Sequence, residues 1–309
     1  MMKKFAVLLM AMLVLLLAAC SDGQDSNKKE STDKKDKSSD KITYQSENGP
    51  VEVPADPKRV VVLAAFAGNL MALDVPVVGA DSWSMANPRF KDSLKDAKEV
   101  SEENLEQIAE LNPDLIIGYS TTKNLDKLKK IAPTITYTYG KVDYLQQHVE
   151  IGKLVNKEKE AEDWVADYKK RAADSEKKIK DKIGEDASVS VIESFDKQLY
   201  LYGDHWGRGT EVLYQGLHLK MPEKVAKSVA KDGYYALSTE VLPEYAGDYL
   251  IVSKDKASDN SFQNTDTYKN IPAVKNNHVL EVDQKEFYFN DPLTVDYALK
   301  TFTDYFTKQ

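Results

Sequence analysis

Short β-branched and aliphatic runs alternate with amphipathic runs over the first half of the chain. Apolar runs of this length favour buried strands, and we expect strands at 59–65 (RVVVLAA), 75–80 (VPVVGA), 114–119 (DLIIGY) and 134–139 (TITYTY). Between them, segments 104–111 and 125–131 predict helices. This alternation is typical of a mostly parallel sheet with helices on its faces.

A long charged segment follows, 158–183, which reads EKEAEDWVADYKKRAADSEKKIKDKI and contains no glycine or proline. Apolar side chains recur on one face of it, at Ala161, Trp164, Val165, Tyr168 and Ala172. Such a helix would span about 39 Å at ~1.5 Å per residue. The pattern fits a solvated surface helix, and it also fits a rigid strut between two lobes.

After residue 184 the alternation begins again. Strands are expected at 188–193, 198–202, 248–253 and 278–283, and helices at 210–219 and 292–306, the last with Pro292 in its first turn. We therefore predict an α/β fold of two Rossmann-like lobes, 42–157 and 184–309, joined by the single long helix 158–183. A cleft between lobes is the expected ligand site.

The N-terminus is typical of an exported protein. Residues 1–19 carry two lysines, an apolar run too short to span a bilayer and then small residues, which predicts a signal peptide. Leu17-Ala18-Ala19-Cys20 resembles a lipoprotein cleavage site, so Cys20 is the predicted lipidation site; an ordinary secretory signal is the alternative. Segment 20–41 has no large apolar residue and predicts a flexible tether after Cys20.

Composition and motifs exclude several functions. The formal net charge of -8 argues against nucleic-acid binding. The sequence has no nucleophile-elbow or phosphate-loop motif. The single cysteine lies at the signal boundary, and the four histidines are scattered, so we expect no directly bound metal and no cofactor. The histidines are His148, His205, His218 and His278.

Aromatic residues are abundant instead, with seventeen tyrosines and three tryptophans. Several fall where predicted strands end, which is where open α/β sheets bind ligands. They are Tyr119, Tyr139, Tyr200, Tyr202, Trp206 and the run Phe287-Tyr288-Phe289. Core packing explains any one of these tyrosines, whereas the group favours a lined pocket.

The mature chain resembles the substrate-binding lipoproteins of bacterial iron–siderophore ABC importers, especially the ferric hydroxamate binders of Gram-positive bacteria. The resemblance rests on PKRVVVL, NLEQIAELNPDLIIGYS, APTITYTYG, LYLYGDHWGRGTEVLYQGLHLKM, AGDYLIVS and FYFNDP. It implies two α/β lobes bridged by a rigid helix, and Fe(III) bound only within a siderophore. The ligand-binding positions that match are Tyr119, Tyr139, Tyr200, Trp206 and Arg208.

Two further positions carry weaker indications of ligand contact. Tyr288 stands where relatives have tryptophan, which leaves its contact and the ligand preference open. Trp83 follows the second predicted strand and is a cleft candidate on position alone. Aromatic faces suit the apolar shell of a caged iron complex, and the Arg208 guanidinium suits its polar oxygens. A triply charged catecholate complex would require several cations converging in the pocket. Of the four arginines only Arg208 is placed convincingly, which favours a neutral or weakly charged hydroxamate; lysines in loops are the alternative source of charge.

The resemblance also implies partners. Glu106 and Glu240 match the glutamates that dock on the permease dimer, which works with its ATPase; alone, each would be an ordinary helix-start carboxylate. We expect a monomer, held by lipid on the extracytoplasmic face of the cell membrane. Two alternatives remain open at this point: the same fold binding haem, a corrinoid or a ferric catecholate, and a surface enzyme acting on the iron complex.

Overall fold

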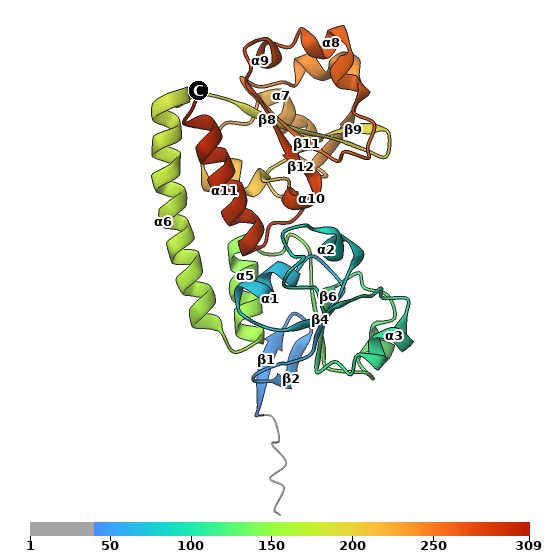
Figure 1. Cartoon of the computed structure of the whole chain (residues 1–309). Coiled ribbons are helices and arrows are strands. Elements are labelled where there is room, and N and C mark those ends of the chain that lie inside the picture. The colour runs from blue at the N-terminus through green and yellow to red at the C-terminus, as the bar shows by residue number, and fades with distance from the viewer. Residues whose placement is uncertain (1–39) are drawn as a thin grey trace, which may run out of the picture. The chain divides into compact units, whose positions relative to one another are not determined.

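The computed structural model describes residues 40–309, which contain two five-stranded sheets and one two-stranded hairpin (Figure 1). The predicted signal peptide 1–19, Cys20 and almost all of the predicted tether lie outside the described residues. The hairpin of β1 (Lys41–Ser46) and β2 (Gly49–Pro54) begins at Lys41, the last residue of the predicted tether. Within the described part, no helix is long and apolar enough to cross a bilayer.

The sheet of the first lobe is entirely parallel, with strand order β5-β4-β3-β6-β7. Its strands are β3 (Val60–Val62), β4 (Val77–Ala80), β5 (Lys98–Glu99), β6 (Leu115–Tyr119) and β7 (Thr134–Tyr137). The four predicted strands are confirmed, although β3 ends at Val62 and the chain then turns towards the cleft. Helices α1 (Ala67–Ala72), α2 (Ser82–Ala86), α3 (Leu105–Glu110), α4 (Leu125–Leu128) and α5 (Tyr144–Leu154) connect or follow these strands.

The sheet of the second lobe is mixed, with strand order β10-β9-β8-β11-β12. Its strands are β8 (Val189–Phe195), β9 (Gln198–Tyr202), β10 (Tyr234–Leu237), β11 (Tyr249–Lys254) and β12 (Val279–Asp283). Asp196 and Lys197, both with positive φ, form the two-residue turn between β8 and β9. So short a connection permits only antiparallel pairing, and the second lobe therefore differs from the first.

The predicted helix 210–219 is the main departure in this lobe. The structure has a π-helical turn instead, η1 (Glu211–Gly216), in which the Leu217 amide donates to the Val212 carbonyl. Such wide turns are concentrated at functional sites. The other helical segments are α7 (Glu223–Val229), η2 (Thr239–Glu244), η3 (Ser261–Asn264), α8 (Asp266–Lys269), α9 (Pro272–Lys275), α10 (Gln284–Phe287) and α11 (Pro292–Phe306).

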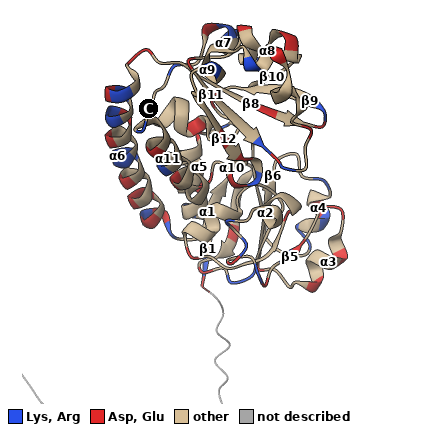
Figure 2. Ribbon diagram, turned by 45° about the horizontal axis from the view of Figure 1, so that its top comes forward, with Lys and Arg blue, Asp and Glu red and all other residues tan. Residues whose placement is uncertain are grey.

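The long helix α6 (Glu158–Ile183) has the predicted bounds and joins the two lobes. It packs on α5 of the first lobe and on α11 of the second. Tyr168 is fully buried, and the Trp164 indole donates to Asp296 of α11 at 3.3 Å. Figure 2 shows acidic and basic residues alternating along α6. The prediction of two lobes with a long helix between them is therefore confirmed, and the charged face of the helix is its outer side (Figure 2).

The lobes also contact each other directly at the base of the cleft. Phe90 of the first lobe stacks on Phe289 of the second, with ring centroids 5.7 Å apart. Asp291 caps α11 and lies against Gly68 of α1, where a Cβ would meet its Oδ1 at 2.0 Å. Glycine is therefore required for this approach, and the long helix is not the sole connection between the lobes.

The buried cap Asp291 should make stability depend on pH. Burial raises the pKa of Asp291 to about 6, above the unfolded value of about 3.9. The folded state then binds more protons between these values, so its stability falls as the pH rises from about 4 to about 6. Asp291→Asn should remove this pH dependence. Between about pH 4 and about pH 6, the free energy of unfolding of the variant should therefore increase relative to that of wild type by on the order of 2 kcal/mol.

Urea unfolding of both proteins at a series of pH values measures this difference. Asp143 caps α5 in the same way but is exposed, which makes Asp143→Asn the matched control. A constant difference between Asp291→Asn and wild type over this pH range would contradict the prediction.

Candidate functional site

A cavity of about 470 Å³ lies between the two sheets and is walled by segments of both lobes. Its lining is mainly aromatic and aliphatic. The lining residues are Leu63, Ala64, Ala65, Asp81, Trp83, Tyr119, Ser120, Thr121, Tyr139, Trp206, Gly207, Arg208, Tyr288, Phe289 and Asn290. The volume falls within the range of small-molecule sites, roughly 300–1,000 Å³.

The first-lobe wall is built from the ends of parallel strands. The chain passes from β3 to β4 on one side and returns to β6 on the other, so the sheet reverses order between β3 and β6. Ligands of open α/β sheets bind at such a point. Leu63–Ala65 follow β3 and Tyr119–Thr121 follow from the end of β6, which places both segments there.

Asp81 positions Trp83 on this wall. The Asp81 carboxylate accepts from the amides of Trp83 and Ser84 at 3.0 and 3.1 Å and so caps the short helix α2. Burial raises the pKa of Asp81. Trp83 itself is 40% exposed, and it stacks on Tyr288 of the other lobe with a centroid distance of 4.3 Å and an interplanar angle of 14°.

The second-lobe wall is formed by the glycine-flanked segment 207–209. Gly207, Arg208 and Gly209 all have positive φ, at 66°, 57° and 79°. A Cβ on Gly207 would lie 2.1 Å from the Tyr288 carbonyl oxygen, and the Arg208 amide donates to the Phe287 carbonyl at 2.6 Å. The left-handed turn therefore seats this segment on 287–289 and turns Arg208 towards the cavity.

Arg208 is buried, with 7% of its surface exposed, and is paired with a carboxylate. Its Nε lies 3.2 Å from both oxygens of Glu193, and its Nη2 lies 2.8 Å from Oε1. Glu193, on β8, is completely buried and also accepts from the hydroxyls of Tyr202 and Ser253. A buried charge requires such a partner, because desolvation without one is costly.

The environment keeps the guanidinium charged. Burial alone lowers the pKa of Arg208, but the attraction of Glu193 outweighs it, and the net shift is upward. The guanidinium carbon lies 4.6 and 4.5 Å from the ring centroids of Tyr202 and Tyr288. Nη1 donates to the Trp206 carbonyl at 2.9 Å. These contacts use three of the five guanidinium donors.

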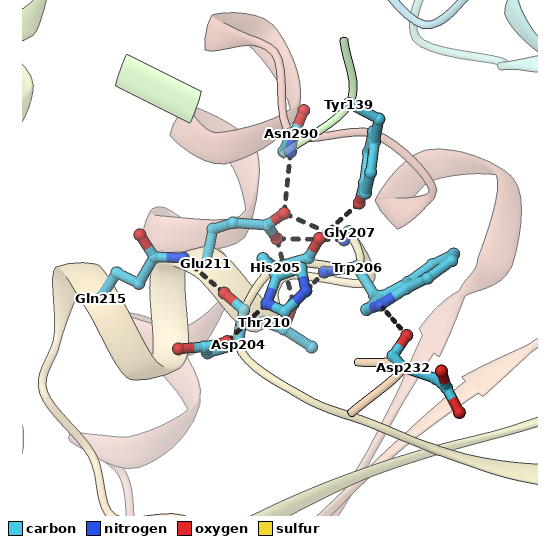
Figure 3. A network of polar contacts seen from close by, with 10 residues as sticks. All are labelled: Tyr139, Asp204, His205, Trp206, Gly207, Thr210, Glu211, Gln215, Asp232 and Asn290. Atoms are coloured by element: carbon cyan, nitrogen blue, oxygen red, sulfur yellow. Dashed lines mark hydrogen bonds and ion pairs between the residues drawn. The ribbon is translucent and has the colours of Figure 1, made fainter. Parts of the chain in front are cut away.

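Three further aromatic rings continue around the cavity. The ring centroids of Tyr119 and Tyr139 are 5.9 Å apart, and those of Tyr139 and Trp206 are 5.6 Å apart. The Tyr139 hydroxyl donates to the His205 carbonyl across the cleft, as Figure 3 shows. The Trp206 indole donates to the Asp232 carbonyl at 3.2 Å, which fixes its plane.

A second buried carboxylate, Glu211, stabilises the glycine-flanked segment 207–209 through hydrogen bonds (Figure 3). It accepts from the Gly207 amide at 3.1 Å, the Thr210 hydroxyl at 3.0 Å and the Asn290 amide at 2.8 Å. Burial raises the pKa of Glu211. This network ties the segment 207–211 to the segment that follows α10.

The structure brings six of the seven predicted ligand residues to one cavity. They are Trp83, Tyr119, Tyr139, Trp206, Arg208 and Tyr288. Tyr200 does not line it: it lies within the antiparallel strand β9, with its ring 6.0 Å from that of Tyr234, which in turn contacts Trp206. Glu106 and Glu240 are exposed residues of α3 and η2 and are not part of the cavity wall.

Sequence reasoning missed several residues that shape the site, chiefly Asp81, Glu193, Glu211 and Asn290, whereas Phe289 belongs to the predicted aromatic group and does line the cavity. One signal was available for Glu193. It ends the apolar run SVSVIE in a predicted strand, and a carboxylate in a buried strand implies a buried partner. No comparable signal marked Glu211, because charged residues are ordinary near the start of a helix.

The cavity presents ring faces and few charges, which suits the binding of a bulky, largely apolar ligand. In residues 40–309, no group of three histidine, aspartate, glutamate or cysteine residues is placed to hold a metal ion.

The family model described as "Periplasmic binding protein" matches residues 60–286, which covers most of the chain and every cavity-lining residue before Tyr288. The chain belongs to this family. The resemblance drawn from the sequence is thus confirmed at the level of the family, whose members bind ligands rather than catalyse reactions.

Individual relatives agree in length and fold. The iron(3+)-hydroxamate-binding protein YxeB of Bacillus subtilis (strain 168) is 38% identical over 98% of this chain and 97% of its own. The FhuD protein from S. pseudintermedius has 40% identity and a TM-score of 0.80 over 87% of this chain and 99% of its own. FhuD2 from Staphylococcus aureus with bound ferrioxamine B has 37% identity and a TM-score of 0.78 over 82% and 99%. These structures confirm the predicted fold class.

Removing one partner of the Arg208–Glu193 pair should be strongly destabilising. Arg208→Met leaves the Glu193 carboxylate buried without its cation, which should lower the free energy of unfolding by about 3 kcal/mol or more. The control is Arg171→Met, which removes ion pairs of α6 that are partly exposed and should cost about 1 kcal/mol or less. Urea unfolding at neutral pH measures both, and equal losses would refute the prediction.

Proposed function

We propose that this protein is the membrane-anchored substrate-binding component of an ABC importer, which captures Fe(III)-hydroxamate siderophores and delivers them to the permease. The observation that carries the proposal is the aromatic cavity with one buried, paired arginine on its wall. The similarity to iron(3+)-hydroxamate-binding relatives supports the same ligand class.

The lining suits a metal complex that is already caged by its own oxygen ligands. Trp83, Tyr119, Tyr139, Trp206 and Tyr288 offer wide ring faces to an apolar shell at a low cost in rotamer entropy. The two unused donors of Arg208 can reach the partly negative hydroxamate oxygens. Because the siderophore supplies every iron ligand, the protein needs no side chain on the metal.

Delivery to the permease would use the exposed carboxylates. Glu106 lies in the first turn of α3 in the first lobe, and Glu240 lies in the first turn of η2 in the second. Both are exposed and separate from the cavity wall. One carboxylate on each lobe fits a dimeric partner, with complementary charges that set register and speed encounter.

The anchor would be lipid on Cys20, after removal of the signal peptide 1–19. The segment that follows Cys20 is polar, and its acidic and basic side chains balance. A flexible chain of this length reaches about 25 Å, at ~5–6 Å times the square root of the residue number. The folded body would therefore stay close to the outer face of the cell membrane.

Ligand class is tested by titrating the purified protein with ferrichrome, ferrioxamine B, a ferric tris-catecholate and haem. Tryptophan fluorescence should be quenched by the two hydroxamates, because two of the three tryptophans line the cavity. Trp206→Ala should weaken hydroxamate binding by at least about tenfold, as expected for a central aromatic contact.

The control for Trp206→Ala is Trp164→Phe, which changes the tryptophan between α6 and α11 and should leave affinity near wild type. Preferential binding of haem or of the catecholate would contradict the hydroxamate proposal and would identify another class of ligand. Turnover of the iron complex by the isolated protein would instead indicate an enzyme.

Permease docking is tested by the double substitution Glu106→Ala and Glu240→Ala. Hydroxamate affinity should stay unchanged, because neither residue lines the cavity, whereas uptake of ferric hydroxamate by cells should stop. Glu103→Ala with Glu244→Ala, exposed glutamates of the same two regions, serves as the matched control. Normal uptake by the Glu106/Glu240 variant would refute the docking role.

A further inference from the structure

Arg208 is the only lysine or arginine among the described residues that line the cavity. Its charge is not free, because the Glu193 carboxylate lies within hydrogen-bond distance of Nε and Nη2. A cation and an anion this close act on a ligand as a dipole rather than as a net charge. The arginine can therefore orient polar oxygens without attracting an anion strongly.

Glu193 is fixed in this role by its surroundings. It is completely buried in the middle of the mixed sheet, and hydroxyls of Tyr202 on β9 and Ser253 on β11 donate to it. It has no exposed surface, so solvent does not screen its attraction for Arg208. Arg208 on the cavity wall is thus paired with a carboxylate that lies outside the lining.

The remaining ionisable groups near the cavity add no positive charge. Asp81 is the one acidic side chain among the described lining residues, on the first-lobe wall. Glu211 lies behind the segment 207–210, where it accepts from Gly207 and Asn290. The cavity accordingly has a balanced or slightly negative electrostatic character.

We propose that Glu193 is a specificity-determining positioning residue: by neutralising Arg208 it restricts the site to neutral or cationic ferric complexes and excludes anionic ones. This inference rests on the proposed function, because it assigns the charge class of the same ligand. Glu193 acts through Arg208 and does not itself line the cavity.

The test measures affinity for ferrichrome, which is neutral, and for a triply anionic ferric tris-catecholate. Glu193→Gln keeps the side-chain shape and leaves the Arg208 charge uncompensated. The affinity ratio of catecholate to ferrichrome should rise by at least about tenfold relative to wild type, as expected for an unmatched charge in a poorly solvated site. Glu193→Asp, which retains the charge, should return the ratio towards wild type.

Glu281→Gln is the matched control, since Glu281 lies on β12 of the same lobe and pairs with Lys254 away from the cavity. It should leave the ratio unchanged. An unchanged ratio in a folded Glu193→Gln protein would overturn the inference. Failure of wild type to bind any ferric hydroxamate would overturn the proposed function instead, so the two failures are distinguishable.

A double variant, Glu193→Gln with Arg208→Gln, keeps the inference testable if Glu193→Gln does not fold. It removes both charges together and leaves no unpaired ion in the core. Because the net charge of the pair is unchanged, the ratio should stay within about threefold of wild type. A decrease of tenfold or more in the affinity ratio of catecholate to ferrichrome, relative to wild type, would show that Arg208 acts as a free cation. That result would overturn the inference.

Discussion

The buried ion pair between Arg208 and Glu193 is the interaction on which the site depends. It joins the left-handed segment 207–209 to the central strand β8 of the second lobe. It also allows the Arg208 guanidinium to be buried at the cavity wall. Neither partner could be buried alone, because an isolated charge in the interior is too costly. The pair therefore sets both the shape and the charge of the surface that faces the ligand.

Lobe geometry is set by contacts that leave little freedom at the base of the cleft. The helix α6 packs on both lobes, Phe90 stacks on Phe289, and Gly68 fits against the cap Asp291. The stack of Trp83 on Tyr288 adds a cross-cleft contact at the cavity itself. Close-packed contacts of this kind shift between discrete arrangements rather than deform continuously.

Local patterns in the sequence were sufficient for most elements of the fold. The bounds of α6 and α11 follow from unbroken helical periodicity and a proline at the first turn, and the parallel strands of the first lobe follow from apolar runs. The antiparallel pairing of β8 and β9 and the π-helical turn after Thr210 were missed. The pairing was open to prediction, because only four residues separate the predicted strands 188–193 and 198–202 and so short a connection permits only antiparallel pairing. The π-helical turn depends on hydrogen bonds around Glu211, which residue patterns do not encode.

For the site, the sequence by itself determined the supply of aromatic side chains near strand ends and the glycines beside Arg208, because strand and turn preferences are local. Only the tertiary structure decided which rings share the cavity: it brought Trp83 and Tyr288 together and left Tyr200 inside its strand. It also decided that Arg208 is neutralised, since Glu193 lies 15 residues away along the chain and reaches it through sheet pairing. Charge compensation is a property of distance in space, and the fold alone fixes that distance.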